Sequence, residues 1–240
     1  MSIAISAVSP ITTCIDFSSV SVRRNGHLVT AQCYFDSTQY NDNDFDFLTI
    51  SLPDSLQRAV AKRKSEFLAG RYLAKIALHS IGRSCHDIAI GKNRAPVWPQ
   101  GILGSISHTS AIAQCVITDH QNYQYIGLDI EHLLTSADAN NIASSIVQSA
   151  AEYLPLMTYL SFNTAITLIF SAKESLFKAI YKEVGKYFDF SAAQVTSFEF
   201  TKNELTLTII QELSLTIPYG KKFQCKYEIR DDLVKTLITN

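Results

Sequence analysis

The chain has 240 residues, of which 47% are hydrophobic, enough for one large core or two cores of about 100 to 150 residues each. Its 21 basic and 22 acidic residues nearly cancel, so the excess positive charge of a duplex-binding protein is absent and no nucleic-acid partner is expected. No apolar run reaches the roughly 18 residues that span a bilayer, and Met1–Val22 lacks the pattern of a secretory signal. We therefore expect a cytoplasmic protein without stable membrane insertion.

The five cysteines are an odd number and are too widely spaced for a zinc or redox motif, at positions Cys14, Cys33, Cys85, Cys115 and Cys225. This spacing predicts buried, structural thiols in a reducing compartment.

The first predicted element is a β-hairpin over residues 20–35, closed at Asn25-Gly26. The next is a long helix from Leu56 to Ser80, with its start signalled by Pro53-Asp54-Ser55. Its periodicity predicts that five positions are buried, namely Leu56, Val60, Phe67, Ala74 and Leu78. The helix also holds the largest local excess of positive charge in the chain, which by itself fits a solvated face.

Residues 91–104 contain two prolines and three glycines, which predicts a surface loop. This loop holds Arg94 and the only tryptophan, Trp98. Two interpretations stay open for Trp98: it lines a ligand site, or it covers the edge of the core.

The carboxy-terminal part begins with an alternating strand over residues 123–131, whose period of two places Asp129 and Glu131 on one side. Gly127, on the same side, leaves room for a close approach. A helical region over 140–160, interrupted by Pro155, and a helix over 164–184 follow. The last helix is predicted to bury a stripe and to carry a polar face opposite it. Three strands are predicted at the carboxy-terminal end of the chain, over 195–199, 204–211 and 222–230.

The polar residues of these elements fit a magnesium site, because Mg²⁺ prefers oxygen ligands and shares them with substrate phosphates. Asp129, Glu131 and Glu174 supply carboxylates, and Lys173 and Lys178 supply charges for phosphate. Each feature alone also fits a structural role. Glu174 and Lys178 form a pair that is common on helix surfaces. The two strand carboxylates could equally face solvent, and His108 could be a hydrogen-bonded residue of the core or of a loop.

Taken together, five blocks in order resemble the 4′-phosphopantetheinyl transferases, specifically the monomeric, broad-specificity type that includes siderophore-synthase activators. Gly127-Leu-Asp129-Ile-Glu131 is similar to that family's Gly-hydrophobic-Asp-x-Glu motif, and Phe170-Ser-Ala-Lys173-Glu174-Ser-Leu-Phe-Lys178 to its helix signature. The three upstream blocks are Arg63–Arg71, Arg94–Pro99 and Gly104–Thr109. The chain departs from the wider family after the helix, where Gly185-Lys-Tyr187-Phe188 replaces a common Gly-x-Gly-Leu segment.

The resemblance implies an α+β fold of two pseudo-symmetric halves, residues 1–122 for the coenzyme A nucleotide and 123–240 for metal binding and catalysis, with the active site between them. It implies that Asp129, Glu131 and Glu174 bind Mg²⁺. It also implies a set of residues that contact coenzyme A, namely Arg63, Arg71, Arg94, Ser107, His108, Lys173 and Lys178. Glu152 lies where the family often has an acid, and its role stays open.

The implied reaction transfers the 4′-phosphopantetheine arm of coenzyme A to a serine of an apo acyl, peptidyl or aryl carrier protein, with release of 3′,5′-ADP. Glu174 or a water on the metal would take the serine proton, and Lys178 would stabilise charge. The partner would serve siderophore, nonribosomal-peptide, polyketide or fatty-acid synthesis, and a monomer is expected. Two alternatives stay open: a metal-dependent nuclease or phosphodiesterase, and a non-catalytic carrier-binding module.

Overall fold

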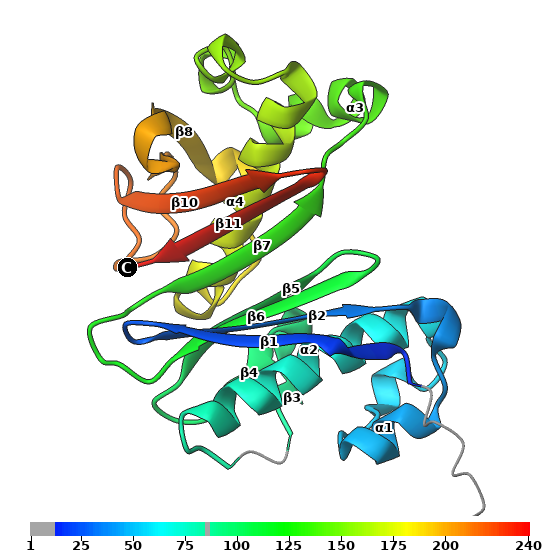
Figure 1. The fold of residues 1–240 in the computed structure, drawn as a ribbon. Coiled ribbons are helices and arrows are strands. Elements are labelled where there is room, and N and C mark those ends of the chain that lie inside the picture. The colour runs from blue at the N-terminus through cyan, green and yellow to red at the C-terminus, as the bar shows by residue number, and fades with distance from the viewer. Residues whose placement is uncertain (1–12, 85–86) are drawn as a thin grey trace, which may run out of the picture.

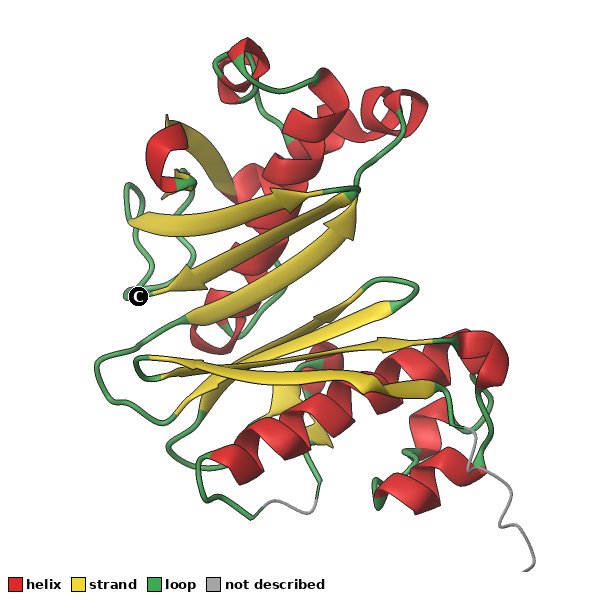
Figure 2. Cartoon of the chain, viewed as in Figure 1, coloured by secondary structure: helices red, strands yellow, loops and turns green. Residues whose placement is uncertain are grey.

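The computed structural model describes residues 13–84 and 87–240. Two antiparallel sheets lie one above the other in Figure 1, each with a long helix on one face. The strands of the first sheet fall within residues 15–118 and those of the second within residues 126–239. Helices and antiparallel strands both contribute heavily (Figure 2), which confirms the α+β prediction.

The amino-terminal sheet has the strand order β1-β2-β6-β5. Its strands are β1 (Ile15–Asn25), β2 (Leu28–Phe35), β5 (Leu103–His108) and β6 (Ile112–Thr118). Helix α2 (Ala61–Ser80) packs on this sheet through fully buried side chains, including Leu68, Leu73 and Leu78. Helix α1 (Asn43–Leu48) and a two-stranded hairpin of β3 (Ala89–Ile90) and β4 (Pro96–Val97) complete this half.

The carboxy-terminal sheet has the order β7-β11-β10-β9-β8. Its strands are β7 (Ile126–His132), β8 (Ala193–Glu199), β9 (Glu204–Ile209), β10 (Lys222–Arg230) and β11 (Leu233–Thr239). Helix α4 (Phe162–Val184) lies behind this sheet in Figure 1, and α3 (Ser136–Ile146) packs against α4. The Ser161 side chain caps α4 by accepting from the Thr164 amide, and Gly185 ends it with a φ of 69°.

Edge strands β5 and β7 join the two sheets by serine hydroxyls. The Leu128 amide donates to Ser105 Oγ at 3.0 Å, and the Ile130 amide donates to Ser107 Oγ at 3.3 Å. The backbone groups on the free edge of β7 therefore find partners on the other half of the molecule. This joint brings the end of β5 beside Asp129.

Four predicted elements differ from the structure. The region predicted as helical over 140–160 is α-helical only to Ile146, after which 3₁₀ turns form at 150–152 and 156–158. The hairpin is confirmed, but its two-residue turn is Gly26-His27, because Asn25 still pairs with Leu28. Residues 54–56 form a separate 3₁₀ turn and α2 begins at Ala61, so Val60 stays 71% exposed rather than buried. Residues 91–104 hold β4 and the start of β5 as well as loop. Strand β11, which the sequence prediction omitted, lies between β7 and β10.

Helix α4 is buried on more than one side. The predicted apolar stripe is confirmed as buried, at Ile169, Ala172, Leu176, Ala179 and Ile180. The opposite, polar side is only partly solvated. Ser171 and Ser175 are fully buried against the sheet, and both hydroxyls bond Thr236 Oγ1, at 2.9 and 2.7 Å. Small polar residues here let the helix lie close to the strands. Glu174 and Lys178, on the same side, are half-buried.

Gly127 is the point of closest approach between β7 and α4. A Cβ atom at this position would lie 1.8 Å from the Ser175 carbonyl oxygen, which belongs to helix backbone and cannot rotate away. Gly127→Ala should therefore lower the free energy of unfolding by about 3 kcal/mol or more. Urea denaturation followed by circular dichroism measures this loss.

A matched control is Gly82→Ala, where the added Cβ meets no atom within 4 Å but the φ of 74° is strained. Its cost should be only about 1 kcal/mol. Equal losses in the two variants would show that the close packing of β7 on α4 is not what Gly127 protects.

Cys14, Cys33, Cys115 and Cys225 are buried and free, as predicted, whereas Cys85 lies outside the described residues. Residues 1–12, part of the segment considered for a secretory signal, also lie outside them. Within residues 13–84 and 87–240, no helix is both long and apolar enough to cross a membrane.

Candidate active site

A cavity of about 450 Å³ opens in the amino-terminal half and gathers four of the predicted ligand-binding residues. Arg63 and Arg71 come from α2, Arg94 from the turn between β3 and β4, and His108 from the end of β5. Three guanidinium groups in one cavity suit phosphate groups chemically, because each offers several N–H donors and a permanent charge.

Two of these arginines are held in place by their neighbours. Arg63 Nη1 lies 3.4 Å from His108 Nε2 and 3.4 Å from Glu66 Oε2. Arg71 donates from Nε to the Ile88 carbonyl at 2.9 Å, and its guanidinium carbon lies 4.6 Å from the centre of the Phe67 ring. Burial lowers the pKa of Arg71 to about 10, which still leaves it charged at neutral pH.

Burial lowers the pKa of His108, and the adjacent positive charge of Arg63 lowers it further, although Glu66 opposes this effect. The imidazole is therefore neutral at pH 7 and has one ring nitrogen to donate and one to accept. Such a group suits a nucleotide, which presents both kinds of atom.

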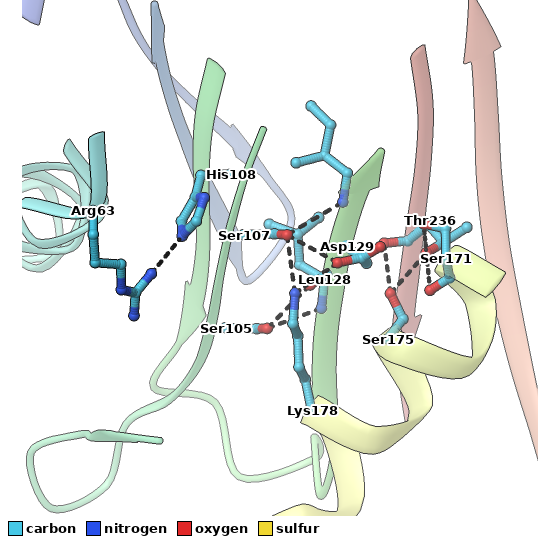
Figure 3. Close-up of polar contacts among 11 residues, drawn as sticks. Arg63, Ser105, Ser107, His108, Leu128, Asp129, Ser171, Ser175, Lys178 and Thr236 are labelled. Atoms are coloured by element: carbon cyan, nitrogen blue, oxygen red, sulfur yellow. Dashed lines mark hydrogen bonds and ion pairs between the residues drawn. The ribbon is translucent and has the colours of Figure 1, made fainter. Parts of the chain in front are cut away.

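Asp129 lies next to this cavity, on the other side of β5. Figure 3 shows its carboxylate between β5 and α4, and Oδ1 accepts from Ser107 Oγ at 2.9 Å and from Lys178 Nζ at 2.7 Å. Asp129 is only 2% exposed, and its second oxygen, Oδ2, is buried with no partner among the described residues. A buried carboxylate oxygen without a donor is the kind of atom that a cation satisfies.

Glu131 and Glu174 lie within electrostatic reach of Asp129. Burial raises the pKa of Glu131 to about 7, and the charges of Asp129 and Glu174 add to this rise. Burial likewise raises the pKa of Glu174, with Asp129 adding to the effect and Lys178 opposing it. The three carboxylates repel one another, so a cation among them would be favoured.

The donor set fits Mg²⁺, which prefers a few carboxylates together with water and phosphate oxygens. Across the described ranges, 13–84 and 87–240, no group of three or more His, Cys, Asp or Glu side chains is already arranged around a metal position. The carboxylates are thus electrostatic neighbours rather than a preassembled cage. Lys178 supplies the positive charge that Asp129 contacts in this structure.

Comparisons with known proteins show the family to which the chain is similar. Residues 52–118 match the model of the 4′-phosphopantetheinyl transferase N-terminal domain, and residues 125–236 match that of the 4′-phosphopantetheinyl transferase superfamily. Enterobactin synthase component D of Salmonella typhimurium is 35% identical over 85% of this chain and 83% of its own length.

The chain belongs to the 4′-phosphopantetheinyl transferase family. It is therefore an enzyme that transfers phosphopantetheine to apo carrier proteins. A second relative is enterobactin synthase component D of Escherichia coli K12, which is 35% identical over 80% of this chain and 84% of its own length. A third is the 4′-phosphopantetheinyl transferase PptT of Mycobacterium tuberculosis, which is 26% identical over 76% of this chain and 82% of its own length. The nuclease and the non-catalytic module are set aside in favour of the transferase.

The position of Lys173 in this transferase corrects one prediction. The resemblance implies that Lys173 contacts the coenzyme's phosphates, but its side chain is only 2% exposed. Its Nζ donates to the Ile146 carbonyl at 2.7 Å and to the Phe190 carbonyl at 3.3 Å, and it pairs with Glu152 Oε2 at 2.9 Å. Three acceptors match the three protons of the ammonium group, so none remains for a phosphate.

Glu152, whose role the sequence left open, is the buried partner of Lys173. Its Oε1 accepts from the Gln148 amide at 2.6 Å, and its Oε2 accepts from the Val195 amide at 3.0 Å. The pair ties α4 to the 3₁₀ turn at 150–152 and to the start of β8. The buried pair of Lys173 and Glu152 therefore fixes the position of the α4 turn that carries Glu174.

Ser107 is placed differently from the arginines, because its buried hydroxyl contacts Asp129 and accepts from Lys178 Nζ at 2.9 Å. Sequence reasoning assigned it to coenzyme A and missed this contact. The signal available was the spacing of Ser105 and Ser107, which puts both hydroxyls on one side of a strand. Nothing in the sequence showed which strand that side would meet.

Proposed function

We propose that this transferase moves the 4′-phosphopantetheine arm of coenzyme A onto a serine hydroxyl of an apo carrier protein in a Mg²⁺-dependent reaction that releases 3′,5′-ADP. The observation that carries the proposal is the adjacency of two residues on β5. His108 lines the arginine cavity, and Ser107 before it bonds Asp129. One strand thus sets a phosphate-binding cavity directly beside a buried carboxylate site.

Coenzyme A would bind with its nucleotide and 3′-phosphate in the arginine cavity. Arg63, Arg71 and Arg94 supply charge-assisted donors, and neutral His108 supplies one further hydrogen bond. The pyrophosphate would then lie toward Asp129 and Lys178, across the end of β5.

Asp129, Glu131 and Glu174 would hold Mg²⁺. When bound, the ion supplies Lewis-acid stabilisation of charge on the pyrophosphate oxygens. The unpartnered Oδ2 of Asp129 and the mutual repulsion of the three carboxylates support this role.

The carrier's serine oxygen would form a bond to the β-phosphorus of coenzyme A, while the bond from that phosphorus to the bridging pyrophosphate oxygen breaks. The bridging oxygen leaves on 3′,5′-ADP. Glu174 would take the serine proton, because burial raises its pKa and so makes its carboxylate a better base. Lys178, whose side chain keeps 27% exposure, would neutralise charge on the leaving group.

The carrier is proposed to belong to siderophore synthesis of the nonribosomal-peptide kind. This choice rests on relatives called enterobactin synthase component D, which match at 35 to 38% identity. Polyketide and fatty-acid carriers would be secondary substrates.

Mass spectrometry of the carrier tests the proposed function. The transferase is incubated with Mg²⁺, coenzyme A and an apo aryl or peptidyl carrier domain. The carrier should gain the mass of one phosphopantetheine group, and 3′,5′-ADP should appear in equal amount. A carrier with its acceptor serine replaced by alanine should stay unchanged. An unmodified wild-type carrier, or transfer that persists in excess EDTA, would contradict the proposal.

Arg63 offers a cleaner test of the nucleotide site than buried Arg71, because its side chain is 35% exposed and its loss should not disturb the core. Arg63→Ala should raise the KM for coenzyme A by roughly 10- to 100-fold and leave kcat nearly unchanged, since one charge-assisted bond to phosphate contributes about 1.5 to 3 kcal/mol. Steady-state kinetics with varied coenzyme A measures both constants.

The matched control is Lys62→Ala, on the preceding residue of α2, whose side chain is exposed and does not line the cavity. Its KM should equal that of the wild type. If both variants raised KM equally, the effect would come from general surface charge and not from the cavity.

A further inference from the structure

The tip of the β3–β4 hairpin carries Arg94 in an unfavourable backbone conformation. Asn93 has φ 53° and ψ 34°, and Arg94 has φ 64°, so two successive residues other than glycine lie in the left-handed region. Asparagine tolerates this region, but arginine rarely adopts it. Tight hairpin turns require positive φ at both central residues, so this turn sets the direction of Arg94, and a contact that fixes the turn also fixes Arg94 at the cavity.

The structure shows one such contact. Asn93 Nδ2 donates to Tyr181 Oη at 2.7 Å, which links the hairpin to α4 in the other half of the molecule. The Tyr181 ring is steadied by Phe177, whose centroid lies 5.2 Å away. In the part of the chain that the structure describes, no other hydrogen bond or ion pair joins residues 89–97 to the carboxy-terminal half.

The hairpin also forms a wall between two cavities, because Gly91 and Pro96 line both. One is the arginine cavity. The other, of about 260 Å³, is lined by Trp98 on the side of the hairpin and by Lys178 and Tyr181 on α4. A displacement of the hairpin relative to α4 would consequently move Arg94 with respect to both Lys178 and the remaining arginines.

We propose that Asn93 and Tyr181 are positioning residues that hold Arg94 ready for the phosphate of coenzyme A. The inference rests on the proposed function, since it takes coenzyme A as the ligand of the arginine cavity. The bond fixes the hairpin before the ligand arrives, so less conformational freedom is lost on binding. Tyr181 lies one helical turn after Lys178, so the bond also keeps the nucleotide site in register with the catalytic face of α4.

Tyr181→Phe removes the hydroxyl that accepts from Asn93 and keeps the ring on Phe177. Isothermal titration calorimetry with coenzyme A and Mg²⁺ should show a Kd raised about fivefold, as for the loss of one neutral hydrogen bond. The kcat at saturating coenzyme A should stay within about twofold, because no group that contacts the reacting atoms is lost. Asn93→Gly, which keeps the left-handed backbone accessible but deletes the bond, should give the same Kd.

Tyr219→Phe is the matched control, because Tyr219 is 71% exposed and its hydroxyl bonds none of the described residues. Its Kd for coenzyme A should equal that of the wild type. A melting temperature within about 2 °C of wild type in all variants would show that binding, and not folding, is being measured.

A double-mutant cycle decides whether the bond acts through Arg94. Arg94→Ala alone should weaken coenzyme A binding, and adding Tyr181→Phe should weaken it no further. Equal effects of Tyr181→Phe with and without Arg94, or a fall in kcat at unchanged Kd, would overturn the proposal. Wild type that binds coenzyme A without transferring its arm would refute the proposed function alone, whereas wild type that does not bind coenzyme A would overturn both.

Discussion

Asp129→Asn should lower kcat by roughly 10² to 10³-fold, because the substitution removes the charge that would bind Mg²⁺ and orient Lys178. The amide has nearly the shape of the carboxylate and can still accept from Ser107 and Lys178, which lie 2.9 and 2.7 Å from Oδ1. The fold should therefore persist. Single-turnover transfer to an apo carrier at saturating Mg²⁺ and coenzyme A measures the loss, and the thermal melt checks the fold.

Asp232→Asn is the matched control for Asp129. Asp232 lies just before β11 and accepts from His132 at the end of β7 at 2.9 Å, but its side chain is 71% exposed. Removal of this charge should leave kcat unchanged. If Asp129→Asn transferred phosphopantetheine at the wild-type rate, the assignment of the metal site to this carboxylate would be wrong.

Glu152→Ala should lower the free energy of unfolding by about 3 to 5 kcal/mol, because it leaves the buried ammonium of Lys173 without its counter-charge. Both side chains are only 2% exposed, and burial already lowers the pKa of Lys173. The two amides that Glu152 accepts from, those of Gln148 and Val195, would also lose their partner. Urea denaturation at pH 7 measures the change.

The double variant Glu152→Leu with Lys173→Met should recover much of this stability, since the main cost is a lone buried charge rather than the loss of an attraction. Glu199→Ala, which breaks the exposed pair with Lys202 at 3.0 Å, should have no measurable effect. A mild result for Glu152→Ala would mean that Lys173 is free to leave the pair, and it would return to the set of candidate phosphate ligands.

Local pattern was a good guide wherever one element decided the outcome. The period of β7 places Gly127, Asp129 and Glu131 on one side, and the close approach expected at Gly127 is made by the Ser175 carbonyl. The buried stripe of α4 follows from its helical period. The order of the motif blocks indicated the family, because the residues in such blocks are set by the reaction and not by the packing of the elements around them.

Elements whose limits depend on distant partners were predicted less well. Strand β11 follows β10 after a two-residue turn and pairs with it, but its other partner, β7, lies far earlier in the chain. The pairing with β7, which places β11 inside the sheet, has no local signal in the residues of β11. The start of α2 moved to Ala61 because residues 54–56 close a separate turn.

The sequence by itself determined the family, the α+β class and the side of β7 that carries the acidic pair, since these depend on residue order and on the period of single elements. Only the tertiary structure distinguished the two signature lysines. Lys173 and Lys178 are five residues apart on α4. Lys173 is buried in an ion pair with Glu152, whereas Lys178 is partly exposed and contacts Asp129. That difference arises from which segment packs on each side of the helix, and packing between distant segments leaves no local pattern in the chain.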